Sequence, residues 1–197
     1  PGTVRINMED YVNRMLESFP YEVTGTSASP APDYLFTTRD EANKLDPEMH
    51  AAFHTMVAKG LFACKRARPD IQLIIAFLST RVREPDEDDW KKLIKLLKYL
   101  NGTRKLALKL STNNMSVLKW YVDASFAVHP DCRGHTGGLL TLGSGAAYST
   151  STKQKLDAKS STESELIGVD DVLPQILWTN YFMEKQGIDL TNTILYQ

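Results

Sequence analysis

Asp123 is an acidic side chain inside an otherwise apolar run. It lies in WYVDAS, residues 120–125, where Trp120 and Val122 alternate with Tyr121 and Asp123. This period of two, in a run rich in aromatic and β-branched residues, predicts a half-buried strand. An unpaired buried carboxylate would destabilise the fold by several kcal/mol. We therefore expect Asp123 to be paired with a cation, coordinated to a metal, or placed at the wet end of the strand.

Two glutamates lie in the first turns of a helix that the sequence predicts after residue 160. At 100° per residue, the centre of the apolar stripe lies about 60° from Glu165 and about 100° from Glu163. The stripe consists of Leu166, Val169, Val172, Leu173, Ile176 and Leu177. The geometry predicts that Glu165 faces the sheet and approaches Asp123, with no lysine or arginine between the two carboxylates.

These glutamates have two interpretations. Two neighbouring carboxylates favour a divalent cation such as Mg²⁺ or Mn²⁺, because hard oxygen ligands suit these ions and like charges at short range need a counter-ion. Alternatively, Ser160 with Glu163, or Thr162 with Glu165, forms a capping box that needs no metal. The spacing alone leaves both interpretations open.

Basic side chains gather in two segments. Between Trp90 and Leu110 there are seven lysines and arginines and no acid, and helical spacing puts three of the lysines on one face. The candidate phosphate contacts here are Lys91, Lys95, Lys98, Arg104 and Lys105. The loop HPDCRGH adds Arg133 and His135. Such groups could follow a phosphate backbone, with binding weakened by salt, or form a solvated helix face and an exposed turn.

Composition limits the classes of protein. The chain has 197 residues, 42% hydrophobic and 24% charged, which suits one or two small cores. The net charge of −1 gives no overall attraction to nucleic acid, so any such contact needs a local patch. Cys64 and Cys132 show no CxxC spacing, and we expect free thiols. With no signal-peptide pattern and no membrane-length apolar run, we expect an intracellular protein of the cytoplasm or nucleus, neither secreted nor membrane-bound.

The order of patterns predicts a mixed α+β protein. A strand and a helix fill residues 1–23, and a Ser-, Thr-, Gly- and Pro-rich linker covers 24–45. Helical periodicity then predicts a small helical unit over 46–105, with Asp46 and Asp86 as helix caps. From residue 106 to 197 short strands, a long helix and a last strand predict an α/β domain with a mixed sheet.

Several motifs in this order resemble copia-type LTR retrotransposon polyproteins. Four segments of this sequence resemble the ribonuclease H domain of that family: YVDAS, DCRGHTGGLLTLG, STSTKQKLDAKSSTESEL and VLPQILWTNYF. An earlier segment resembles the family's connection between reverse transcriptase and ribonuclease H: ARPDIQLIIAFLSTRVREPDEDDWKKLIKLLKYLNGTRKLALKL. The segment VRINMEDYVNRMLESFP resembles the end of the family's polymerase. The resemblance implies a reverse transcriptase tail at 1–23, a helical connection at 46–105 and a ribonuclease H-like domain at 106–197.

The same resemblance implies an activity and its partners. Family members hydrolyse the RNA strand of RNA/DNA hybrids with Mg²⁺ or Mn²⁺, and Asp123 and Glu165 match the first two catalytic, metal-binding positions. The implied partners are an RNA/DNA hybrid or other nucleic acid and the remainder of the polyprotein.

The chain also departs from the family pattern. In the family an Asp-Asn pair supplies the third metal ligand directly after a strand like ILYQ, whereas this sequence stops at Gln197. A later helix, a fourth acidic residue and the polymerase Asp-Asp motif are also missing. We therefore expect a domain truncated at its C-terminus and an impaired nuclease. The alternative is a non-catalytic module that binds nucleic acid or another partner.

Overall fold

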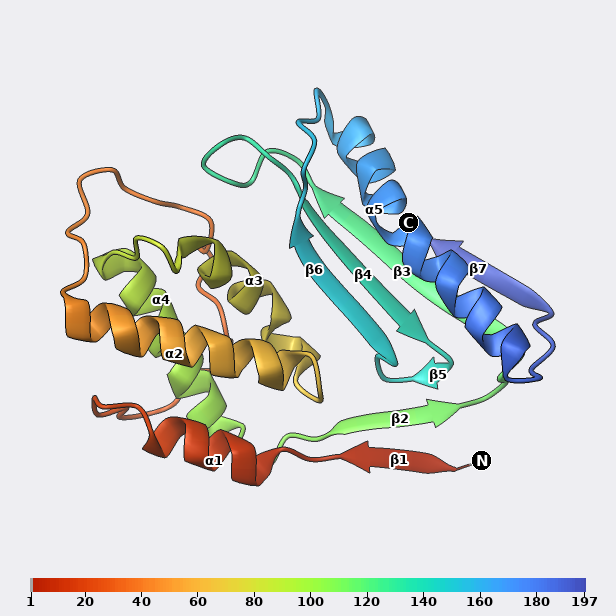
Figure 1. Cartoon of the computed structure of the whole chain (residues 1–197), viewed down its shortest axis with the longest axis horizontal. Helices are drawn as coiled ribbons and strands as arrows, with labels where there is room; N and C mark the ends of the chain where they lie inside the picture. Colours follow the sequence, from red (N-terminus) through yellow and green to blue (C-terminus); the bar gives the residue numbers. More distant parts are fainter. Residues whose placement is uncertain (1) are drawn as a thin grey trace. The chain divides into compact units, whose positions relative to one another are not determined.

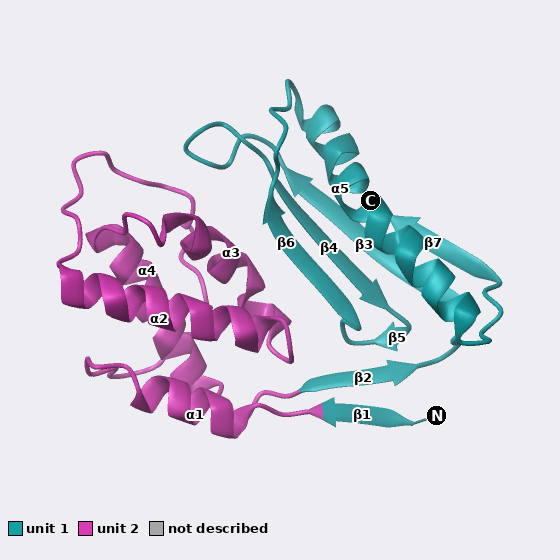
Figure 2. Ribbon diagram, in the orientation of Figure 1, with its two compact units in different colours: residues 1–5, 108–197 teal, residues 6–107 magenta. Residues whose placement is uncertain are grey.

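The computed structural model of the chain describes residues 2–197 (Figure 1). These residues divide into two compact units (Figure 2). Unit 1 combines the N-terminal residues up to Arg5 with Leu108–Gln197, and unit 2 is Ile6–Ala107. The first strand of the chain thus belongs to the β-rich unit, and the first helix belongs to the helical unit. Within the described residues, no helix has the length and apolar character needed to cross a membrane.

Unit 2 is helical, as the periodicity of its sequence predicts. Its elements are α1 (Glu9–Glu17), α2 (Pro47–Cys64), the short 3-10 helix η1 (Pro69–Ile71), α3 (Gln72–Arg81) and α4 (Glu87–Gly102). The two predicted caps are confirmed. The Asp46 carboxylate accepts a hydrogen bond from the backbone N–H of Met49 at 2.8 Å. Asp86 forms a capping box with Asp89, so the first orphan N–H groups of α4 are satisfied.

The core of unit 2 includes a buried lysine. Lys92 on α4 is 1% exposed, although it belongs to the basic segment of the sequence. Its ammonium donates to the backbone carbonyl of Thr37 at 2.7 Å and lies 4.6 Å from the ring centroid of Phe77. Asp89 provides the opposite charge at 3.7 Å. Lys92 therefore stabilises the helical unit and is not one of its accessible cations.

Unit 1 contains two sheets. A three-stranded sheet has the order β1-β2-β5, from β1 (Thr3–Ile6), β2 (Leu108–Thr112) and β5 (Gly143–Ser144). A four-stranded sheet has the order β6-β4-β3-β7, from β3 (Val117–Ser125), β4 (His135–Thr141), β6 (Tyr148–Lys153) and β7 (Asn192–Tyr196). In the second sheet β3 is antiparallel to β4 and parallel to β7, and β4 is antiparallel to β6. The mixed α+β class is confirmed.

The long helix α5 (Ser161–Lys185) covers one face of the four-stranded sheet. Leu118, Trp120 and Val122 point toward it and are at most 3% exposed. Gly168 permits this approach, because a Cβ at that position would lie only 3.1 Å from the Cβ of Ala124. The alternate residues of β3, including Asp123, therefore lie on the open face that α5 does not cover.

The buried side of α5 differs from the predicted stripe. Leu166, Leu173 and Leu177 are 65%, 41% and 46% exposed. The other half of the stripe is confirmed: Val172 and Ile176 are buried, and Val169 packs against the same core. The helix also buries Ser164, Ile167, Gly168, Thr179 and Met183. The prediction was wrong for the three leucines because α5 is apolar on two sides, and helical periodicity does not say which side meets the sheet.

Candidate functional site

Asp123 lies on the open face of β3 and is exposed. Its partner across the antiparallel pair is Gly137, which has no side chain to cover the carboxylate. The described residues include no hydrogen-bond or ion-pair partner for this side chain. The structure therefore places Asp123 at an exposed position, where the side chain is accessible to an external ligand.

Glu165 is half-buried in the first turns of α5. Its Oε2 accepts a hydrogen bond from Nε2 of Gln197 at 3.3 Å. Gln197 directly follows β7, the parallel neighbour of β3, in which Tyr196 is paired with Tyr121. The Glu165 carboxylate thus reaches the end of the strand that lies beside the Asp123 strand.

The predicted capping box of Ser160 with Glu163 is formed in part. Ser160 is the N-cap of α5, and its hydroxyl accepts a hydrogen bond from the backbone N–H of Glu163 at 3.2 Å. The Glu163 carboxylate in turn accepts from the backbone N–H of Lys159 at 2.6 Å. Because the helix begins at Ser161, Thr162 is not its cap, and Glu165 is left without a capping role.

Asp123 and Glu165 are the two carboxylates predicted to bind a divalent ion. Within residues 2–197 there is no group of three or more His, Cys, Asp or Glu side chains that could hold a metal ion. Asp123 and Glu165 supply hard oxygen ligands of the kind that Mg²⁺ prefers. Metal binding at this pair stays a prediction.

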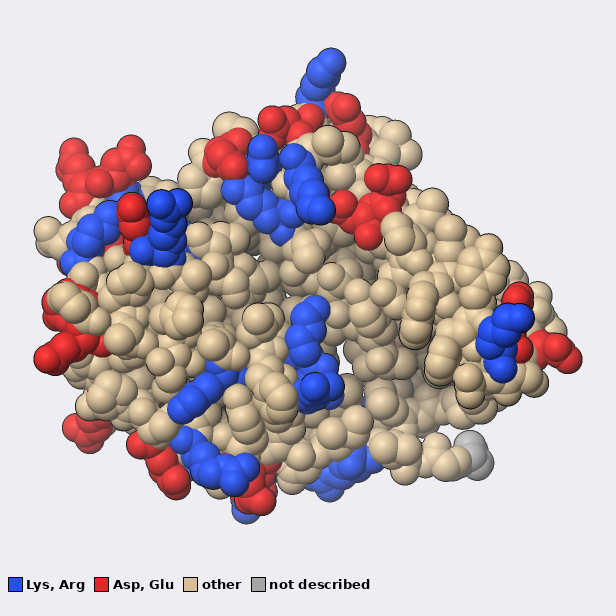
Figure 3. All heavy atoms as spheres, in the orientation of Figure 1, with Lys and Arg blue, Asp and Glu red and all other residues tan. Residues whose placement is uncertain are grey.

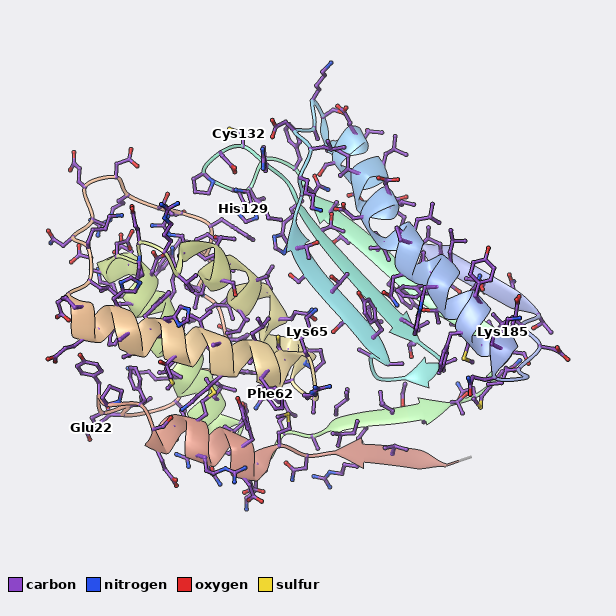
Figure 4. All side chains as sticks on the ribbon, in the orientation of Figure 1. Glu22, Phe62, Lys65, His129, Cys132 and Lys185 are labelled. Atoms are coloured by element: carbon purple, nitrogen blue, oxygen red, sulfur yellow. The ribbon has the colours of Figure 1, made fainter. Side chains whose placement is uncertain are left out.

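His129, in the loop between β3 and β4 (Figure 4), forms a buried pair with His135, the first residue of β4. His129 and His135 are 4% and 5% exposed, and Nε2 of His129 lies 3.0 Å from Nδ1 of His135. Nε2 of His135 lies 2.6 Å from the hydroxyl of Ser151 on β6. Burial and the neighbouring His129 lower the pKa of His135 to about 4. A phosphate contact by His135 stays a prediction, and it would require the ring to leave these partners.

Arg133 belongs to an ionic network at the same loop. Its Nε lies 3.1 Å from Asp157 and 3.7 Å from Asp131. Asp131 also pairs with Lys153 at 2.6 Å. Hydrogen bonding to that lysine lowers the pKa of Asp131 against the opposing effect of burial. Arg133 and Lys153 are therefore already balanced by carboxylates, and phosphate would have to compete with them.

The predicted basic residues of unit 2 differ in their surroundings. Lys91 pairs with Asp88 at 2.9 Å, and the Arg104 guanidinium binds the amide oxygens of Asn101 and Asn13. Within the described part of the chain, no partner is found for the side chains of Lys95, Lys98 and Lys105. Over the face drawn in Figure 3, basic and acidic side chains are interspersed. Any attraction for phosphate must therefore be local.

Sequence reasoning missed an exposed aromatic pair on the open face. The rings of Tyr121 and Tyr196 are stacked, with centroids 4.8 Å apart and an interplanar angle of 15°. Tyr121 could have been placed on the Asp123 side of its strand, because the two residues are separated by one period of two. The parallel pairing with β7, which brings Tyr196 alongside, is not visible in the sequence.

The fold and site define a mixed α+β protein with an exposed carboxylate on an open sheet face. Comparison with known proteins finds relatives among transposon proteins. It is 27% identical to the retrovirus-related Pol polyprotein from transposon TNT 1-94 of Nicotiana tabacum, over 97% of this chain and 15% of the polyprotein. It is also 27% identical to the putative transposon Ty5-1 protein of Saccharomyces cerevisiae, over 89% of this chain and 57% of that protein.

A third relative is named as a secreted effector and not as a transposon protein. The chain is 30% identical to secreted RxLR effector protein 161 of Plasmopara viticola, over 56% of this chain and 79% of that protein. No family model and no solved structure matches the chain. Retrotransposon Pol polyproteins of plants and a putative transposon protein of yeast are thus homologues of the chain, which aligns with a small part of the length of the polyproteins.

Proposed function

We propose that residues 106–197 are the ribonuclease H-like part of a retrotransposon polyprotein, which hydrolyses the RNA strand of RNA/DNA hybrids. In this proposal residues 1–23 are the end of the reverse transcriptase and residues 46–105 are the connection. The observation that carries it is the open-face position of Asp123, with the Glu165 carboxylate at the end of the adjacent parallel strand. The homology to Pol polyproteins supports the same assignment.

The residues suit a magnesium or manganese site. Among residues 2–197, Asp123 is exposed with no cation paired to it, and the hydrogen-bond partner found for the Glu165 carboxylate is the neutral amide of Gln197. These two side chains would hold the ions, which when bound activate water and stabilise the leaving oxygen. The protein's own contribution is to fix Asp123 on β3 and Glu165 on α5, with Glu165 on the side of the sheet that α5 covers and Asp123 on the open face.

A third carboxylate beside Asp123 and Glu165 would hold the ions more firmly and raise the rate. Two carboxylates hold two ions less firmly than three, and each 1.36 kcal/mol of lost transition-state stabilisation is tenfold in rate. In β3 and β7 the paired residues Tyr121 and Tyr196 share a face. Continued by two residues, this register would place an aspartate added after Gln197 beside Asp123 on that face.

The test is cleavage of an RNA/DNA hybrid, labelled on its RNA strand, in the presence of Mg²⁺. We compare this chain, a version extended by Asp-Asn after Gln197, and both with Asp123→Asn or Glu165→Gln. We expect the extension to raise the rate and each substitution to lower it about a hundredfold or more. The matched control is Asp170→Asn, which removes an exposed carboxylate of α5 outside the proposed site. Cleavage that survives Asp123→Asn would contradict the assignment.

A non-catalytic module that binds nucleic acid is the second candidate. It is favoured by the cations of α4, where the Lys95 and Lys98 side chains are partly exposed and no partner is found for them among the described residues. The same hybrid, bound in EDTA and followed by fluorescence anisotropy, separates the two functions. Binding without cleavage, even in the extended chain, would favour the module over the nuclease.

A further inference from the structure

Tyr121 and Tyr196 form a platform on the open face of the four-stranded sheet. They are 44% and 41% exposed, and the parallel pairing of β3 with β7 holds their rings face to face. Because each ring covers one face of the other, the pair offers a ligand its outer ring faces and ring edges. β7 is an edge strand, so no neighbouring strand of its sheet covers the outer face of Tyr196. The strand pairing fixes both backbones, so little conformational entropy is lost when a flat ligand stacks on them.

Apolar, basic and acidic side chains surround the tyrosine pair on the open face. Leu139 on β4 is paired with Tyr121, and Ile194 on β7 lies two residues before Tyr196 on the same face of the sheet. Both side chains are half-buried. Lys119 precedes the platform on the same face, and Asp123 follows it at a strand spacing of about 6.7 Å for two residues. A ligand on the platform therefore meets an apolar floor, with a cation on one side and a carboxylate on the other.

We propose that this platform binds unpaired bases of single-stranded nucleic acid, with Lys119 contacting a phosphate. Exposed aromatic rings on a sheet bind bases by stacking, and every base has a π-face to offer. Bases within a duplex are already stacked on one another, so the platform selects unpaired nucleotides. Repulsion by Asp123 directs the phosphates toward Lys119 when no metal is bound.

This binding goes beyond the proposed nuclease function and needs no divalent ion. It therefore stands or falls separately from catalysis at Asp123 and Glu165. A protein segment seated on the same aromatic surface is the competing occupant, and it would leave the platform without affinity for oligonucleotides.

The experiment measures binding of fluorescein-labelled oligo(dT) and oligo(rU) ten-mers to the full chain in EDTA, by anisotropy. We expect Tyr121→Ala and Tyr196→Ala each to weaken binding about five- to 150-fold. Tyr121→Phe should retain affinity, because the stacking surface remains. Lys119→Ala should reduce the salt dependence of binding. A blunt duplex of the same length should compete poorly.

The chain offers a matched control for surface aromatics. Trp178 and Phe182 on α5 are also stacked, with centroids 5.2 Å apart, and are 59% and 45% exposed. Trp178→Ala should leave oligonucleotide binding unchanged. Circular dichroism melting checks each variant for folding, and Tyr196→Ala, in the last strand, provides the second test if Tyr121→Ala unfolds. Failure of the unmodified chain to bind, unchanged binding by both alanine variants, or an equal loss in Trp178→Ala would overturn the proposal.

Discussion

At the scale of single residues, the surroundings of His129 and His135 lower the pKa of both rings. Their rings share a hydrogen bond at the end of the β3–β4 loop of unit 1, and the folded protein keeps both largely out of water. Burial lowers the pKa of both rings, with His129 adding to the effect on His135 and Lys153 adding to the effect on His129. The folded state therefore favours two neutral rings.

This pair predicts a loss of stability in acid. A histidine in the unfolded chain binds a proton near pH 6.5, whereas His135 in the folded chain does so only near pH 4. As the pH falls from 6.5 to 4, the unfolded state binds more protons, and unit 1 should lose up to about 3 kcal/mol through His135 alone. Urea unfolding at a series of pH values measures this change. His135→Asn should flatten the profile and the exposed His54→Gln should not; equal profiles for all three would contradict the assignment.

At the scale of elements, the start of α5 depends on one hydroxyl. Ser160→Ala removes the hydrogen bond to the Glu163 N–H and should cost about 1 kcal/mol of unfolding free energy, measured by denaturant titration. Ser161→Ala is the control, because Ser161 is the first helical residue and no hydrogen bond of its side chain is found among the described residues. If both changes cost the same, the cap does not stabilise α5.

The packing of α5 on the sheet depends on Gly168. A leucine at this position would push against Ala124 and Val122, whose carbons lie 3.1 and 3.6 Å from the Cβ position. We expect Gly168→Leu to destabilise unit 1 by about 1–3 kcal/mol, with a lowered melting temperature. Asp170→Leu, on the exposed side of the same helix, is the control. Comparable melting temperatures for the two variants would show that the helix does not pack as described.

The elements also show which features a sequence can reveal. Caps such as Asp46, Asp86 and Ser160 follow from local patterns, because the side chain bonds a backbone group within three residues. The sheet-facing side of α5 did not follow, since Leu173 and Val172 are equally apolar and only tertiary packing chooses between them. Parallel pairing of β3 with β7 joins segments that are about seventy residues apart, so the Tyr121–Tyr196 stack was beyond sequence reasoning.

At the scale of the whole molecule, the chain has two separate hydrophobic cores and almost no net charge. One core belongs to the helices of unit 2 and the other lies between α5 and the four-stranded sheet. With a net charge of −1, the molecule has no general attraction for phosphates. Any electrostatic attraction for nucleic acid must come from a few accessible cations, and replacing those cations should change the salt dependence of binding.

The cations of α4 predict such a salt dependence. Lys91, Lys95 and Lys98 share one helix face, and their joint replacement by alanine should weaken hybrid binding and flatten its logarithmic salt slope by about two to three units. Lys91→Ala alone should have the smallest effect, because phosphate must displace its ion pair with Asp88. Anisotropy titrations with an RNA/DNA hybrid at several salt concentrations measure the slope.

The control for this experiment removes the same charge elsewhere. Lys155, Lys159 and Lys185 are exposed lysines of unit 1, and their joint replacement changes net charge identically. If the α4 cations contact phosphate, only the first triple variant flattens the slope, because counter-ion release counts the phosphates that the protein neutralises and not its overall charge. Equal slopes for both triple variants would mean that the lysines of α4 form a solvated helix face.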